Sequence, residues 1–223
     1  MPTAAAVVLA GGSGTRLGAE GNKVYLPLAG RPLLAWSLQA FADAPGVGRL
    51  VLVTRPADRA RAEAVRATND RIEIVDGGTT RHDSERAALR LLAPAIRAGE
   101  LDVVAIHDGA RPLVTQRLIA DVIAAAREHG AAVPGLPLTD VADRDLTPVA
   151  GTLTRVQTPQ AFRADLLLAA YEQADADCFS GTDTAACVER YAGVPVHCIQ
   201  GDPRNVKVTY RPDLALVERL LRS

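Results

Sequence analysis

The sequence is poor in cysteine, methionine and aromatic residues. Its 223 residues include three cysteines and one methionine, and aromatic residues make up 4% of the chain. Cys178, Cys187 and Cys198 are odd in number and show no C-x-x-C spacing. This pattern argues against a disulfide framework and against a zinc ribbon. We therefore expect buried, reduced thiols.

An excess of one charge and long apolar runs are also lacking. The chain carries 25 Lys and Arg residues against 26 Asp and Glu residues, a net charge of −1, and its isoelectric point is near 6.4. Such a balance argues against a broad basic surface for nucleic acid. No apolar run approaches the roughly 18 residues of a membrane span, and no basic segment precedes the first apolar run. We expect a cytoplasmic protein with a small-molecule partner, no nucleic acid and no membrane.

What the chain does have is a regular alternation of β-branched runs and amphipathic helical patterns. With 48% hydrophobic residues, it is expected to form one globular domain over residues 1–223. The alternation predicts an α/β, Rossmann-like, doubly wound and mostly parallel sheet with helices on both faces. The predicted strands are 4–9, 50–54, 72–75, 102–107, 194–200 and 205–210, and the predicted helices are 32–44, 83–99, 115–130, about 163–174, one after the "SGTD" of 180–183 and one at the C-terminus.

Residues 136–160 interrupt this pattern. Their sequence, "LPLTDVADRDLTPVAGTLTRVQTPQ", is rich in Pro, Asp and Thr and leaves room for one short hairpin. We predict a β-arm that projects from the sheet.

The first predicted strand runs into a glycine-rich loop, "VVLAGGSGTRLG" at 7–18. A dinucleotide fingerprint needs a third glycine where Leu17 stands, and a Walker A loop needs Ser or Thr after the lysine, whereas Val24 follows Lys23. What remains is a glycine loop with two cations, Arg16 and Lys23, suited to a polyphosphate whose charge changes during reaction. The alternative is that the glycines only form a turn and both cations are solvated.

A second motif, "IHDGARP" at 106–112, ends an apolar strand with a carboxylate. Asp108 would lie at the carboxyl edge of the sheet, where a metal that bridges phosphates could bind, and Arg111 offers a fork for another phosphate. Asp108 could instead cap a turn. We interpret His107 as structural.

A third motif, "DGGTTRHDS" at 76–84, joins two glycines to Ser84 at the start of a helix. Backbone groups and a hydroxyl in this position could read a nucleotide base, although Ser84 could also be an ordinary first-turn residue. Because the three motifs follow three strands of one sheet, their combination favours a functional site.

The complete set of motifs resembles one family. "LAGGSGTRLG", "NKVYLPLAGRPLLAWSL", "DGGTTRHDS", "HDGARP", "QTPQAF", "GTDTA" and "NVKVT" occur in this order, as in the 2-C-methyl-D-erythritol 4-phosphate cytidylyltransferases. The resemblance implies that CTP and 2-C-methyl-D-erythritol 4-phosphate, a polyol phosphate, give 4-CDP-2-C-methyl-D-erythritol and pyrophosphate in the non-mevalonate isoprenoid pathway. It also implies Mg²⁺ and a homodimer whose arms exchange. A fused cyclase domain is not expected.

The resemblance further implies roles for single residues. Backbone groups of the glycine loop would wrap the triphosphate, and a second set of residues would bind the cytosine and the ribose. The implied catalytic residues are Arg16, Lys23 and Lys207; the implied nucleotide-binding residues are Ala10, Gly11, Gly12, Gly14, Gly78, Ser84 and Asp108, the last also holding the metal; the implied acceptor-binding residues are Arg111, Thr158, Thr182 and Lys207.

The predicted arm departs from the family pattern. Asp140 leads into Val141 where the family usually has Thr and then Lys, and Ala150 stands at the position of an arginine that reaches the partner's acceptor phosphate. Arg155 is the nearest candidate to replace that arginine. A ribitol 5-phosphate cytidylyltransferase therefore stays open as an alternative enzyme, and a nucleotide-binding regulator without catalysis as an alternative of another class.

Overall fold

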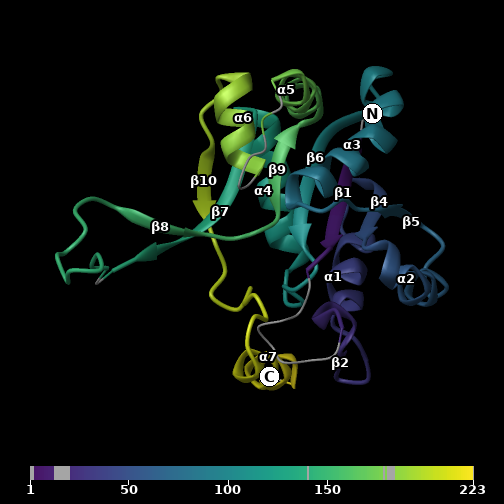
Figure 1. Cartoon of the computed structure of the whole chain (residues 1–223), viewed down its shortest axis with the longest axis horizontal. Coiled ribbons are helices and arrows are strands. Elements are labelled where there is room, and N and C mark those ends of the chain that lie inside the picture. Colours follow the sequence, from purple (N-terminus) through teal and green to yellow (C-terminus); the bar gives the residue numbers. More distant parts are fainter. Residues whose placement is uncertain (1–2, 13–20, 140, 178, 180–183, 223) are drawn as a thin grey trace.

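The computed structural model of the chain describes residues 3–12, 21–139, 141–177, 179 and 184–222. Eight strands form one sheet in the order β10-β7-β9-β6-β1-β4-β5, with β8 paired to β7 (Figure 1). The strands are β1 (Thr3–Ala10), β4 (Val47–Thr54), β5 (Ile72–Asp76), β6 (Leu101–Asp108), β7 (Ala131–Leu138), β8 (Leu153–Val156), β9 (Gln160–Arg163) and β10 (His197–Gln200), and a separate short pair is formed by β2 (Pro27–Leu28) and β3 (Arg31–Pro32).

Helices cover both faces of this sheet. They are α1 (Leu33–Ala42), α2 (Arg59–Arg66), α3 (Arg81–Arg97), α4 (Gln116–His129), α5 (Ala164–Ala176), α6 (Thr184–Ala192) and α7 (Arg211–Arg222), with short 3₁₀ turns η2 (Lys23–Tyr25) and η3 (Pro56–Asp58). Among the described residues, no helix combines the length and the apolar character needed to cross a bilayer.

The alternation of side chains along β1 explains why both faces are covered. Ala6 and Val8 belong to one buried cluster with α1 and α4, whereas Ala5 and Val7 belong to another with α3 and α5. Successive side chains of a strand point to opposite faces, so a strand that is apolar throughout must be buried on both. The predicted doubly wound sheet is confirmed.

The main sheet is parallel on both sides of β9, which runs antiparallel to its neighbours, and the two short pairs β7–β8 and β2–β3 are antiparallel as well. Strands β1, β4, β5 and β6 pair in parallel, as do β7 and β10. Strands β7 and β9 were not among the predicted strands, and β9 lies antiparallel between β6 and β7. Helix α2 was also missing from the prediction. Parallel strands bring their carboxyl ends to one edge of the sheet, and this edge carries the residues described below.

The predicted arm is present. Strands β7 and β8 pair antiparallel from Gly135↔Val156 to Leu138↔Leu153, and the hairpin beyond them extends away from the sheet (Figure 1). The isolated bridge Ala142↔Pro148 closes its outer part.

The predicted strand at 205–210 was wrong, and the predicted strand at 194–200 begins only at His197. Val206 and Val208 alternate with polar residues as in a strand. However, Val208 N donates to Ala110 O at 2.8 Å, and Asn205 Nδ2 donates to Thr158 O at 2.8 Å. The segment is therefore an extended connection bonded to loops at the edge of the sheet, and it brings Lys207 there.

Candidate functional site

A cavity of about 350 Å³ opens at the carboxyl edge of the sheet. Its wall combines residues from all three motifs with the segment before α7. The predicted residues that line it are Gly11, Gly12, Lys23, Gly78, Ser84, Asp108 and Lys207. A larger cavity of about 540 Å³ lies between η2, α1 and α2, but its described lining holds none of the predicted residues. We therefore place the site in the smaller cavity.

Gly11 and Gly12 leave open space at the end of β1. A Cβ on Gly12 would meet no described atom within 4 Å, and one on Gly11 would first meet Ser84 Oγ at 3.7 Å. Internal packing among the described residues therefore does not require glycine here, whereas close approach of a ligand to the backbone would. Ala10, also predicted to bind the triphosphate, is buried, and its carbonyl accepts a hydrogen bond from Asn22 Nδ2 at 2.5 Å.

Asn22 fixes the position of Lys23. Besides Ala10 O, the Asn22 amide contacts Asp58 Oδ2 at 3.1 Å, and its side-chain oxygen accepts from Val24 N at 3.3 Å at the start of η2. This arrangement ties the residue before Lys23 to the end of β1. Lys23 and Lys207 are the only lysines in the sequence, and both line the cavity.

The start of α3 presents Ser84 to the same cavity. Thr80 and Asp83 form a capping box: Thr80 Oγ1 accepts from Asp83 N at 3.0 Å, and Asp83 Oδ2 accepts from Thr80 N at 3.2 Å. A Cβ on Gly78 would collide with Asp83, so glycine is needed for the chain to pass the helix start. Ser84 Oγ donates to Thr80 O at 2.9 Å, which leaves its lone pairs as acceptors.

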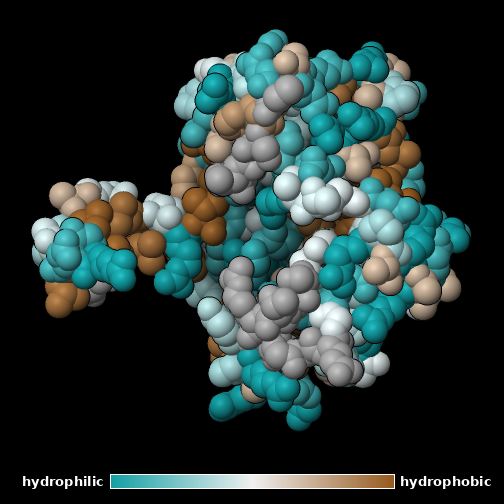
Figure 2. Space-filling model, viewed as in Figure 1, coloured by the Kyte–Doolittle hydropathy of each residue, from teal (hydrophilic) through white to brown (hydrophobic). Residues whose placement is uncertain are grey.

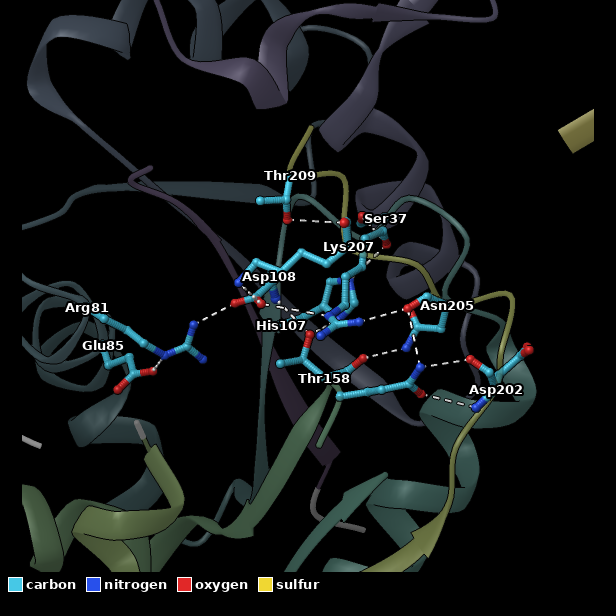
Figure 3. Close-up of polar contacts among 12 residues, drawn as sticks. Ser37, Arg81, Glu85, His107, Asp108, Thr158, Asp202, Asn205, Lys207 and Thr209 are labelled. Carbon is cyan, nitrogen blue, oxygen red and sulfur yellow. Dashed lines mark hydrogen bonds and ion pairs between the residues drawn. The ribbon is translucent and has the colours of Figure 1, made fainter. Parts of the chain in front are cut away.

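Asp108 is the centre of the charge in the cavity (Figure 3). Arg81 Nη1 lies 2.5 Å from Asp108 Oδ1, Lys207 Nζ lies 2.8 Å from Oδ2, and Arg111 Nε lies 3.8 Å from Oδ2. Burial alone would raise the pKa of Asp108, but the charges of Arg81 and Lys207 outweigh it and hold the pKa well below its usual range. The carboxylate is therefore ionised at neutral pH.

His107 has a structural role, as predicted. It is fully buried beside Phe41, and its Nε2 contacts Arg111 O at 3.1 Å. Thr158 Oγ1 contacts His107 Nδ1 at 3.1 Å and accepts from Asp108 N at 3.0 Å. A neutral ring protonated on Nε2 donates to Arg111 O and accepts from the Thr158 hydroxyl at Nδ1. Each of these hydrogen bonds then pairs one donor with one acceptor. Burial lowers the pKa of His107 to about 4.

We expect His107 to make stability depend on pH below neutrality. The unfolded imidazole binds a proton below its ordinary pKa of 6.5, whereas the buried one stays neutral until about pH 4. The unfolded state thus binds more protons in this window, and stability is lost as the pH falls. The loss is about 2 kcal/mol between pH 7 and pH 5. Urea unfolding at both pH values measures it.

The control is the variant His107→Gln, which keeps a donor and an acceptor but does not titrate. It should lose less stability than the wild type between pH 7 and pH 5, and exposed His129→Gln should behave as the wild type. Equal losses in the wild type and in His107→Gln would show that His107 does not titrate as described.

Arg111 and Thr158 lie behind the cavity wall. Arg111 Nη1 donates to Asn205 O at 2.8 Å, and the Thr158 hydroxyl bonds Asp108 and His107 as described above. Both side chains are mostly buried, and they hold the ends of strand β6 and of the segment that carries Lys207. Their predicted contact with the acceptor stays a prediction.

Several predicted residues are placed elsewhere or not described. Gly14, Arg16 and Thr182 lie outside the described residues. Arg155 is exposed on β8, and Ala150 is exposed in the part of the arm that connects β7 to β8.

Two residues beside the cavity were not predicted from the sequence. They are Arg81, which pairs with Asp108, and Glu85, whose Oε1 lies 2.9 Å from Arg81 Nε. A signal for Arg81 was present, because a cation in the first turn of a helix opposes the helix dipole and needs a nearby carboxylate. No local pattern pointed to Asp108 as that partner.

Comparisons with known proteins agree with the motifs. The family model of 2-C-methyl-D-erythritol 4-phosphate cytidylyltransferase matches residues 4–223. The protein of that name from Cereibacter sphaeroides is 44% identical over 226 residues, covering 98% of this chain and 97% of the relative. The one from Geobacillus kaustophilus is 40% identical over 228 residues, covering 98% and 96%. The crystal structure of 4-diphosphocytidyl-2C-methyl-D-erythritol synthase from Anaerococcus prevotii has a TM-score of 0.84 at 27% identity, covering 100% and 97%.

Proposed function

Because the chain belongs to the 2-C-methyl-D-erythritol 4-phosphate cytidylyltransferase family, we propose that the cavity around Asp108 is where it performs that family's reaction. The protein is a CTP-dependent cytidylyltransferase: it joins the cytidylyl group of CTP to 2-C-methyl-D-erythritol 4-phosphate and releases pyrophosphate. The relatives support this activity over the ribitol 5-phosphate alternative and over a regulator without catalysis. The convergence of Lys23, Lys207 and Asp108 on one cavity carries the assignment of the site.

The proposed chemistry needs no side-chain nucleophile. A phosphate oxygen of the acceptor attacks the α-phosphorus of CTP, a new P–O bond forms, and the bond to the β-phosphate oxygen breaks with that oxygen leaving on pyrophosphate. Negative charge rises around the α-phosphorus, and fixed cations stabilise it without reorganisation. Lys23 and Lys207 are suited to this role, together with Arg16. Backbone groups at Gly11 and Gly12 would bind the triphosphate.

We propose Asp108 as the protein ligand of Mg²⁺. Among the described residues, no group of three His, Cys, Asp or Glu side chains could hold a metal. Magnesium, however, is commonly bound by one or two carboxylates together with substrate phosphates and water. An ionised carboxylate in the wall of this cavity fits that demand. When bound, the ion would neutralise phosphate charge.

Pyrophosphate release tests the reaction directly. The protein is incubated with CTP and Mg²⁺ together with either 2-C-methyl-D-erythritol 4-phosphate or ribitol 5-phosphate. We expect rapid release with the first acceptor and slow release with the second. Faster release with ribitol 5-phosphate, or none with either, would overturn the assignment.

We expect CTP to be preferred over UTP. The backbone at Gly78 and the hydroxyl of Ser84 are fixed by the start of α3, and UTP exchanges donor for acceptor at the 4-position of the pyrimidine. A mismatched polar group left unpaired costs about 1–3 kcal/mol, so kcat/KM should be roughly 10- to 100-fold higher for CTP. Steady-state assays with each nucleotide measure the ratio.

The variant Ser84→Ala should lower kcat/KM for CTP. Thr115 provides a matched control, because its hydroxyl caps α4 by accepting from Leu118 N at 3.2 Å and is not among the residues that line the cavity. Thr115→Ala should leave kcat/KM for CTP unchanged. Equal turnover of the two nucleotides by the wild type would mean that this motif does not read cytosine.

We propose that the arm pairs with a second copy of the chain. Leu146, Val149 and Val156 expose 84%, 41% and 44% of their surface, and Figure 2 shows apolar surface gathered on the arm as it stands away from the body. A projecting hairpin has little of its own to pack against, and exposed apolar surface of this kind marks contact sites. A homodimer would cover it. The cytoplasmic location and the absence of nucleic-acid binding stay predictions.

Changing Leu146 and Val149 together to serine should shift the protein from dimer to monomer in light scattering after size exclusion. The matched control is Leu216→Ser, which removes a side chain exposed by 46% on α7; the control should stay dimeric. A wild-type protein that is monomeric at micromolar concentration, or a double variant that stays dimeric, would contradict the proposal.

A further inference from the structure

Glu85 is a buried carboxylate beside the site, and the reaction as described above does not use it. It lies one turn after Arg81 on α3 and exposes 1% of its surface. Three elements supply its partners: Tyr171 OH of α5 donates to Oε2, Thr184 Oγ1 of α6 donates to Oε1 at 2.7 Å, and Arg81 Nε of α3 lies 2.9 Å from Oε1.

Arg81 stands between two carboxylates. Figure 3 shows its guanidinium between Glu85 and Asp108, with Nη1 2.5 Å from Asp108 Oδ1. The contact of Nε with Glu85 lacks the angle of a hydrogen bond, so the attraction between them is mainly one of charge. Arg81 is therefore held by Glu85 on one side and by Asp108 on the other. Since Glu85 also contacts Thr184, these contacts connect α6 to the cavity.

Packing alone does not explain a glutamate at this position. Its neighbours on α3, Ala88 and Leu89, belong to the apolar cluster under the helix. Burial raises the pKa of Glu85, and Arg81, Tyr171 and Thr184 offset that rise only in part. Both hydroxyls donate to the carboxyl oxygens and the third partner is a cation, which is the environment of an ionised carboxylate. Replacing both partners of a buried ion pair with apolar residues of similar volume is often neutral or stabilising, so stability alone does not require the pair. What an apolar residue could not do is hold the Arg81 guanidinium.

The balance of charges around Asp108 also indicates that Glu85 holds Arg81 in place. Arg81, Arg111 and Lys207 are three cations within 4 Å of Asp108, against the two carboxylates Asp108 and Glu85. Without the charge of Glu85, the whole group would gain one positive charge and Arg81 would keep Asp108 as its ion-pair partner. A less constrained guanidinium would be attracted to the polyphosphate of a bound nucleotide, and binding that is equal in the ground state and the transition state lowers KM without raising kcat.

We propose that Glu85 is a positioning residue for the cytidylyl transfer: it holds Arg81 at Asp108 and links the first turn of α6 to the nucleotide cavity. The inference rests on the proposed location of the reaction in this cavity. Glu85 itself touches neither substrate. Its effect on the reaction passes through Arg81 alone.

The first test is Glu85→Gln, which keeps the size and an acceptor oxygen but removes the charge. We expect kcat to fall about tenfold, the lower end of the range found when a residue that supports a metal site from outside its ligands is replaced, while the KM for CTP stays equal or falls. The matched control is Asp175→Asn. Asp175 also links α5 to α3, since Arg86 Nη1 lies 2.7 Å from Asp175 Oδ1, but neither residue lines the cavity. This variant should keep the wild-type kcat.

The second test is a double-mutant cycle with Arg81→Met. If Glu85 acts through Arg81, adding Glu85→Gln to Arg81→Met should lower kcat no further. It should also restore part of the Tm lost in Arg81→Met, because that variant leaves a buried carboxylate without its cation. Asp175→Asn added to Arg81→Met should show no such rescue. An unchanged kcat in Glu85→Gln, or additive losses in the cycle, would overturn the proposal.

Calorimetric titration with CTP separates this result from a failure of the proposed function. A wild-type protein that binds CTP but releases no pyrophosphate would contradict the proposed function. The four proteins of the cycle, namely the wild type, Glu85→Gln, Arg81→Met and the double variant, would still show whether the effect of Glu85→Gln on the Kd for CTP disappears in the Arg81→Met background. A Glu85→Gln effect of equal size in both backgrounds would contradict the positioning role.

Discussion

Replacing Lys23 with alanine is expected to lower kcat about 100- to 1000-fold, the range found when one fixed donor to a developing charge is removed. The KM for CTP should change little, because in the proposed reaction the charge of Lys23 acts mainly on the α-phosphate as it becomes five-coordinate. The backbone groups proposed at Gly11 and Gly12 should still bind the phosphate chain. Steady-state kinetics with CTP and the acceptor varied in turn provide both constants.

The control for Lys23→Ala is Arg117→Ala. The Arg117 side chain is 91% exposed, and it pairs with Asp121 at 3.6 Å. Removing it changes the net charge of the protein by the same amount far from the cavity, so kcat should be that of the wild type. A wild-type kcat in Lys23→Ala would show that Lys23 is not a catalytic residue.

Replacing Asp108 with asparagine is expected to lower both activity and stability. The amide leaves Arg81 and Lys207 without the carboxylate at 2.5 and 2.8 Å, and we expect it to bind Mg²⁺ poorly. Breaking a buried pair costs about 3–5 kcal/mol. Because the side chains of Lys207 and Arg81 are 46% and 27% exposed, solvent screening should keep the loss to about 3 kcal/mol or less.

The stability difference between wild type and Asp108→Asn should depend on pH. The pKa of Asp108 is lowered in the folded protein, so its contribution is present above the ordinary carboxyl pKa and is lost as the pH falls through the folded value. Urea unfolding at pH 7 and pH 3 should therefore show the larger difference at pH 7. Equal stability of the two proteins at pH 7 would mean that the ion pairs around Asp108 contribute nothing.

Local patterns predicted the frame of the molecule well. Strands β1 and β6 are apolar runs, and α3 and α4 begin with capping residues. These signals depend only on residues close together in the sequence, so the spacing alone reveals them. The carboxyl-edge rule then brought Lys23, Ser84 and Asp108 to one cavity. Strand β9 was missed because its four residues gain their regular structure from β6 and β7 on either side.

The parts that could not be predicted depend on contacts distant in the sequence. Glu85 meets Tyr171 and Thr184, which follow it by 86 and 99 residues. The Arg111 guanidinium bonds a carbonyl 94 residues away, a contact that no local pattern indicates, and its expected contact with a phosphate stays a prediction. The segment at 205–210 has the alternation of a strand, but its hydrogen-bond partners are loops whose position only the fold decides.

The confinement of both lysines to the cavity has a practical consequence. Every other basic side chain that carries a permanent charge is an arginine, and guanidinium groups do not react with ordinary acylating reagents. Apart from the α-amino group, an amine-directed label can therefore attach only at Lys23 and Lys207. With the nucleotide bound in this cavity as proposed, the two amines are covered, and we expect this to appear as protection from labelling in a mass spectrum of the intact chain.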